Sequence, residues 1–247
     1  MSRYGSYSDD YYINMNLNTE MDLSQNRETV LHFFEQIQRQ YPTMKNFYGR
    51  ERGEFVLEED KDRGAYRWAS LEGRRVSSGQ VNPASIEETL QQHALVLDMV
   101  PYALSISSLD CESLNIMFGF DFTYRGNHNE LLAEALGIVP AFERLSQIEG
   151  ATLVGYEPSI QLAFDKDCRT QCRLTVETRT SAYHIRTGEF PEEQLSVYLT
   201  ARRYGSLEPG ETFVDSMRRL ATLCQEIVDN YVVENVLRPL QQAIAIR

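Results

Sequence analysis

Alternation between apolar and polar residues predicts two well-defined strands, one near the start of each half of the chain. Residues 13–18 read Ile-Asn-Met-Asn-Leu-Asn, and residues 114–124 place an apolar or aromatic side chain at every second position. Successive side chains of a strand point to opposite faces of a sheet. Each run therefore predicts a strand with one buried face and a second, more polar face.

Apolar residues at helical spacing predict two helices in the first half of the chain. Within residues 27–41 they recur three and four positions apart, which is typical of an amphipathic helix, and Pro42 ends it. Ser85 and Glu88 have the spacing of a capping box, in which the first side chain and the third helical residue satisfy each other's backbone N–H groups. A second helix is therefore expected from Ser85 to Pro101.

A long helix is predicted near the C-terminus, with apolar side chains at alternating spacings of four and three residues. These residues are Phe213, Met217, Leu220, Cys224, Ile227 and Tyr231. Such a seam fits either a helix that lies on a sheet or a contact between two copies of the chain. The first interpretation is favoured, because a heptad pattern this short is common in globular packing.

The order of the predicted elements repeats along the chain. In the first half, strand-like runs at residues 47–58 and 65–76 follow the first strand and helix. In the second half, runs at residues 153–164 and 172–183 occupy the equivalent places, and a further strand is predicted at residues 195–204. A β-α-β-β-α order is that of a ferredoxin-like unit.

We therefore predict an α+β protein built from two tandem, duplicated ferredoxin-like halves related by a pseudo-two-fold. The sheet is expected to be largely antiparallel, with the helices on one side. Residues 1–9 are polar and are expected to form a mobile N-terminal arm. Residues 10–110 would form the first half, and residues 111–247 the second half with its extra strand and long C-terminal helix.

Charge narrows the range of partners. The chain has 24 basic and 36 acidic residues, a net charge of -12, and neither half is basic. This balance argues against a nucleic-acid or anionic-membrane partner, because both need clustered positive charge. Four cysteines are too few for a disulfide framework, and no secretion signal or long apolar run is present, so a cytoplasmic protein is expected.

The sequence lacks the common motifs of catalytic and cofactor sites. It has no phosphate-binding glycine loop, no H-E-x-x-H and no G-x-S-x-G. Cys168 and Cys172 have a spacing that differs from that of zinc knuckles, and no second pair follows. We therefore expect no metal and no cofactor.

The most informative pattern is a polar face that three predicted strands would form if they share a sheet, and the first strand contributes Asn14, Asn16 and Asn18 to it. On residues 172–180, Arg173, Glu177 and Arg179 point away from the apolar side chains, and on residues 195–204 the outward residues include Tyr198, Arg202 and Tyr204. Arginine and tyrosine are enriched at binding hot spots, because a guanidinium binds carboxylates through two hydrogen bonds and a phenol offers area with a polar tip. The alternative is a solvated sheet face with cross-strand ion pairs.

Two functional hypotheses follow. The leading one is a non-catalytic binding or interaction protein, with a protein partner or a second copy of itself, that uses this Arg/Tyr/Glu face or the C-terminal helix. The alternative is an enzyme or small-ligand protein in which Glu177 or His184 acts as a base while Arg173 and Arg202 hold an anionic ligand. A deep, water-excluding cleft would favour the second hypothesis and a flat, open face the first.

Overall fold

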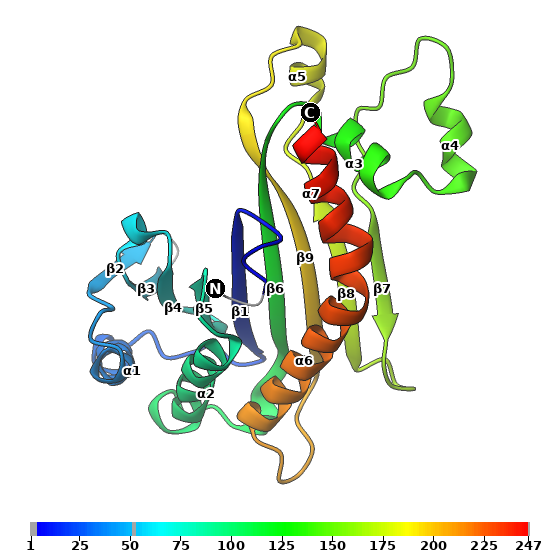
Figure 1. Cartoon of the computed structure of the whole chain (residues 1–247). Coiled ribbons are helices and arrows are strands. Elements are labelled where there is room, and N and C mark those ends of the chain that lie inside the picture. The colour runs from blue at the N-terminus through cyan, green and yellow to red at the C-terminus, as the bar shows by residue number, and fades with distance from the viewer. Residues whose placement is uncertain (1–3, 51–52, 247) are drawn as a thin grey trace.

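A single antiparallel sheet dominates the computed structural model, which describes residues 4–50 and 53–246 (Figure 1). In these residues the sheet has nine strands in the order β2-β3-β4-β5-β1-β6-β9-β8-β7. The strands are β1 (Asp10–Thr19), β2 (Asn46–Arg50), β3 (Glu54–Glu58), β4 (Tyr66–Glu72), β5 (Arg75–Val81), β6 (Cys111–Arg125), β7 (Ser159–Ala163), β8 (Thr170–Glu177) and β9 (Glu192–Tyr204). The helices are α1 (Arg27–Gln40), α2 (Ile86–Ala103), α3 (His128–Leu136), α4 (Pro140–Ser146), α5 (Ala182–Thr187), α6 (Phe213–Ile227) and α7 (Arg238–Ile246).

Strands β1 and β6 pair with each other in the middle of the sheet and carry much of the core. Ile13, Met15 and Leu17 of β1 are fully buried, and so are Phe118 and Phe120 of β6. The alternation in both strands therefore predicted correctly which side chains are buried. The residues between them along each strand lie on the opposite face of the sheet.

Helices α1, α2 and α6 cover one face of this sheet (Figure 1). The first four residues of the predicted seam in α6, from Phe213 to Cys224, are buried, and α6 lies against β6 and β9. The helix continues through a π-helical segment, Val228–Leu237, into α7. The seam is thus the core side of a helix on a sheet, so those four residues are not available to a second copy.

The predicted tandem of ferredoxin-like halves is wrong. A split βαβ unit pairs two strands in parallel across its helix, whereas every neighbouring pair of strands here runs antiparallel. The two halves also form one continuous sheet, because β1 pairs directly with β6.

Errors in strand number contributed to this wrong topology. Residues 47–58 were expected to form one strand but contain most of β2 and all of β3, which pair with each other. Residues 65–76 contain β4 and the start of β5. The first half therefore has five strands, and a meander of four of them returns to β1.

The N-terminal arm packs on the core where it is described. Tyr4 is buried, its ring contacts Tyr11 and Phe120, and its hydroxyl donates to Asp229 Oδ1 over 2.8 Å. Residues 1–3 of the predicted arm lie outside the described residues. Within the described part of the chain, no helix has the length and apolar character needed to cross a membrane.

Candidate functional site

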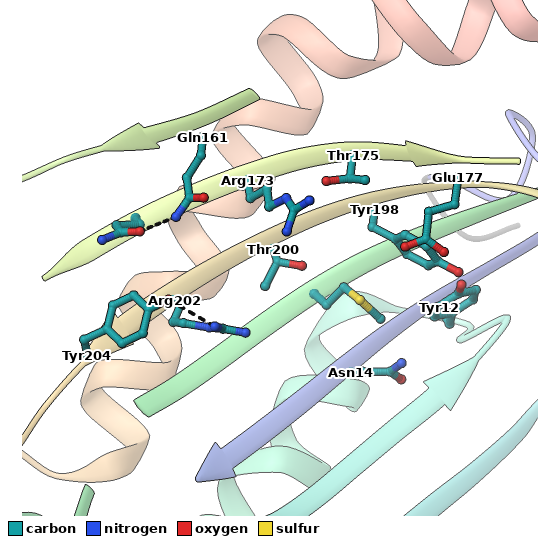
Figure 2. A pocket seen from close by; sticks show the side chains of 12 residues that line it. Tyr12, Asn14, Gln161, Arg173, Thr175, Glu177, Tyr198, Thr200, Arg202 and Tyr204 are labelled. Atoms are coloured by element: carbon teal, nitrogen blue, oxygen red, sulfur yellow. Dashed lines mark hydrogen bonds between the residues drawn. The ribbon is translucent and has the colours of Figure 1, made fainter. Parts of the chain in front are cut away.

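A polar groove of about 540 Å³ lies on the face of the sheet opposite the helices (Figure 2). Strands β1, β6, β9, β8 and β7 all contribute side chains to it. The groove is partly open to solvent, so part of a bound ligand would remain in contact with water. The lining residues are Tyr12, Asn14, Met117, Gln161, Gln171, Arg173, Thr175, Glu177, Tyr198, Thr200, Arg202 and Tyr204.

Five of the predicted site residues line this groove together. Arg173 and Glu177 lie on β8, and Tyr198, Arg202 and Tyr204 lie on β9. They share a face because β8 and β9 are neighbours and their outward positions are in register. The sequence pattern had assigned each strand an outward face, and the sheet brings the two faces together.

The two groove arginines are close neighbours. Arg173 lies opposite Thr200 and Arg202 lies opposite Gln171, which makes the two arginines a diagonal cross-strand pair. Such diagonal positions are about 7–8 Å apart, within reach of long side chains. Arg173 is held toward Ser159 of β7 and Arg202 toward Asn115 of β6, so the space between their positions on the sheet is not filled by either guanidinium group.

Both groove arginines have only neutral hydrogen-bond partners. Arg173 Nε donates to Ser159 Oγ over 3.1 Å. Arg202 Nε donates to Asn115 Oδ1 over 2.7 Å, and its Nη1 donates to the Tyr204 hydroxyl over 3.1 Å. Among the described residues, no carboxylate lies within ion-pair distance of either guanidinium. Their positive charge is therefore not neutralised by the protein.

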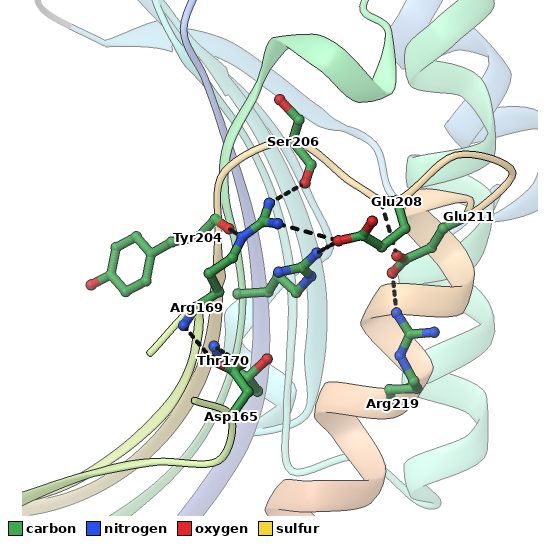
Figure 3. A network of polar contacts seen from close by, with 9 residues as sticks. Asp165, Arg169, Thr170, Tyr204, Ser206, Glu208, Glu211 and Arg219 are labelled. Atoms are coloured by element: carbon green, nitrogen blue, oxygen red, sulfur yellow. Dashed lines mark hydrogen bonds and ion pairs between the residues drawn. The ribbon is translucent and has the colours of Figure 1, made fainter. Parts of the chain in front are cut away.

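Two arginines outside the groove, which line a separate pocket beside α6, are neutralised and have a structural role (Figure 3). Arg169 and Arg203 both pair with Glu208, at 3.2 Å and 3.1 Å. Arg169 also donates to the backbone oxygens of Tyr204 and Ser206. This network fixes the ends of β8 and β9, and with them the position of Arg202 and Tyr204.

Two residues of the groove face, Tyr12 and its partner Asp121, were not predicted as site residues from the sequence. The ring of Tyr12 on β1 lies over Gly119 of β6, where an added Cβ would overlap it. The Tyr12 hydroxyl donates to Asp121 Oδ1 over 3.3 Å. Burial raises the pKa of Asp121, and burial together with Asp121 raises that of Tyr12. Two features of the sequence could have identified these residues. Asp121 is a carboxylate between two phenylalanines, and Tyr12 lies two positions before Asn14, which places it on the polar face of β1.

Two predicted site residues lie outside the groove. Arg179 follows the end of β8 and forms an exposed ion pair with Glu177 at 3.5 Å. His184 belongs to α5, where it lines a separate shallow pocket with Arg125 and Tyr183. Glu177 and His184, the two alternative candidate bases, therefore do not line the same pocket. The cause is local, because β8 ends at Glu177 and Ser181 caps a new helix.

The described residues contain no cluster of three or more His, Cys, Asp or Glu side chains that could hold a metal ion. Cys168 is exposed at a turn, whereas Cys172 is buried within β8. The sequence matches no protein-family model, and no curated protein is significantly similar to it. The groove is therefore the feature on which a functional argument rests.

Proposed function

We propose that this is a non-catalytic binding protein whose sheet-face groove receives a ligand bearing a carboxylate or phosphate group. The observation that carries the proposal is the diagonal pair Arg173 and Arg202, whose partners within the chain are all neutral. Elsewhere at this end of the sheet, arginines are paired with glutamates.

The physical argument is electrostatic. The two positive charges at diagonal positions repel each other. An anion bound between them is attracted by both, and these two attractions offset the repulsion. Hydrogen bonds between a guanidinium and a carboxylate or phosphate are among the strongest in proteins, and a planar guanidinium can form two at once. Tyr198 and Tyr204 add phenol groups beside the arginines.

Binding is favoured over catalysis by the form of the groove. It is open to water, and a catalytic site gains most from excluding water around its reacting groups. The catalytic alternative also drew on Glu177 and His184 as its candidate bases, and these lie in separate pockets.

The proposal predicts arginine-dependent anion binding. Citrate and inorganic phosphate titrated into the protein at low ionic strength should give saturable heats in isothermal calorimetry. Arg173→Gln combined with Arg202→Gln should weaken binding by about tenfold to a hundredfold, since each charged hydrogen bond contributes about 1.5–3 kcal/mol and water replaces part of it.

A matched control uses arginines on the same face of the sheet. Arg50 and Arg75 line a second pocket there, but each pairs with a glutamate. Arg50→Gln combined with Arg75→Gln should leave the anion Kd unchanged. Equal losses in the two double variants, or no saturable binding of either anion, would contradict the proposal.

We propose self-association through β7 as a second function of the sheet. This outermost strand pairs only with β8, and all five of its residues are exposed. Its unpaired backbone groups form a template for another strand. Among the described residues, eight of the fifteen exposed large hydrophobic side chains lie within residues 139–164, which include β7.

Sedimentation equilibrium tests this second proposal. At tens of micromolar the wild-type chain should contain dimers, and Leu162→Lys on β7 should shift it to monomers, because a charge at the paired edge costs more than the exposed leucine contributed. Leu109→Lys changes a side chain that is also exposed, at 75%, but lies away from the edge, so it should leave the equilibrium unchanged. A wild-type chain that stays monomeric at high concentration rules the edge contact out.

A further inference from the structure

We propose that the ligand of the groove is a linear zwitterion, with its anionic group at Arg173 and Arg202 and a protonated amine at Glu177. This inference rests on the proposed function and adds the second end of the ligand. It starts from the order of side chains along the groove, which changes from positive to negative charge (Figure 2).

Cross-strand register places the groove residues in rows. Arg202 lies in the first row with Gln171, and Arg173 lies in the second with Thr200. The third row contains Tyr198 beside Thr175. Residues on one face of a strand repeat every two positions, or about 6.7 Å, so each row is about that far from the next.

The fourth row is acidic. Glu177 lies opposite Ser196 of β9, Ser196 lies opposite Asp121 of β6, and Asp121 lies opposite Asp10 of β1. Three carboxylates therefore lie in one row across four strands. Glu177 lines the groove and is half-buried, while Asp121, on the far side of Ser196, is buried and accepts a hydrogen bond from the hydroxyl of Tyr12.

One cation already contacts this end of the groove. The Arg179 guanidinium lies 3.5 Å from Glu177, but both side chains are more than two-fifths exposed. Exposed ion pairs of this kind contribute little, so an incoming amine can displace Arg179 from the carboxylate. A ligand amine would then add a positive charge to a row with three acidic side chains and one basic neighbour.

The middle of the groove suits a hydrocarbon chain. Between the charged rows lie the rings of Tyr12 and Tyr198, whose centroids are 6.5 Å apart, and the Met117 thioether lies next to them in the row of Arg173. Arg173 and Glu177 are two row spacings apart, with one row between them, which is a backbone distance of about 13 Å. Because both side chains extend into the groove, the ligand's charged groups need to be only about 6–10 Å apart, as in an ω-amino acid with five to seven methylene groups.

Calorimetry with matched probes tests this inference. We would titrate 6-aminohexanoate and 8-aminooctanoate beside hexanoate and hexylamine, all at low ionic strength. At least one of the two amino acids should bind about tenfold or more tightly than hexanoate, and hexylamine should bind most weakly. The shorter 4-aminobutanoate should lose this advantage, because it cannot reach both charged ends.

Variants separate the two ends of the groove. Glu177→Gln should reduce the affinity for the amino acid to that for hexanoate while leaving hexanoate binding unchanged. Glu72→Gln removes an exposed carboxylate from the second pocket on the same face and should change neither affinity. Arg173→Gln combined with Arg202→Gln should weaken both ligands.

The outcomes distinguish this inference from the proposed function. If hexanoate binds through the two arginines but the amine adds no affinity, or Glu177→Gln leaves the amino-acid affinity unchanged, the zwitterion is wrong and anion binding stands. If none of the carboxylate probes binds in an arginine-dependent way, both proposals fail.

Discussion

Replacing Phe118 by alanine should lower the free energy of unfolding by about 3–5 kcal/mol, the usual cost of removing a buried aromatic ring. Phe118 is fully buried in β6, opposite Ile13 of β1 and Leu199 of β9. Its ring also contacts that of Tyr4 at a centroid distance of 6.1 Å. This loss would be a large fraction of the net stability, because a domain has only about 5–15 kcal/mol of it.

Urea denaturation measures this effect. The midpoint should fall while the m-value stays constant, because the surface exposed on unfolding changes little. Met117→Ala is the matched control on the same strand, since Met117 points into the open groove. We expect it to cost less than about 1.5 kcal/mol, because its side chain is only partly buried. Similar losses of stability in both variants would contradict the placement of Phe118 on the core face of β6 and Met117 on its groove face.

The protein should lose stability steeply in acid because of His93. This residue of α2 is fully buried, its Nδ1 lies 2.6 Å from the Ser78 hydroxyl, and burial lowers its pKa to about 3. An unfolded chain has a histidine pKa near 6.5, so between the two values only the unfolded state binds the proton. Stability from this residue is complete above about pH 6.5 and falls by up to about 1.4 kcal/mol per unit below it, a total on the order of 5 kcal/mol by about pH 3.

Urea midpoints measured from pH 7 to pH 4 test the role of His93. His93→Gln keeps a hydrogen-bonding group for Ser78 but cannot be protonated, so the decline with falling pH should become much shallower. Burial also lowers the pKa of His128, which accounts for part of the slope that remains. His32 is exposed on α1, and His32→Gln should leave the slope as it is. An unchanged slope in His93→Gln would show that other groups control acid unfolding.

The sequence by itself determined the character of individual elements. Alternation in β1, β6 and β9 identified which side chains enter the core, and the seam from Phe213 to Cys224 identified the buried side of α6. These predictions succeed because burial of apolar surface imposes a period of two on a strand and about 3.6 on a helix. For the same reason, the arginines and tyrosines of β8 and β9 could each be assigned to the outward face of their own strand before strand neighbours were known.

Only the tertiary structure decided which strands are neighbours, and with that the composition of the groove. Periodicity places Asp121 or Tyr12 on a face but carries no information about the strand beside it, so the row of Asp10, Asp121 and Glu177 could not be foreseen. The same limit made the ferredoxin-like halves plausible, whereas the separation of Glu177 from His184 has a local cause, the end of β8 at Glu177. Strand order is set by pairing between distant segments, whose free energy depends on the whole sheet and not on any local pattern.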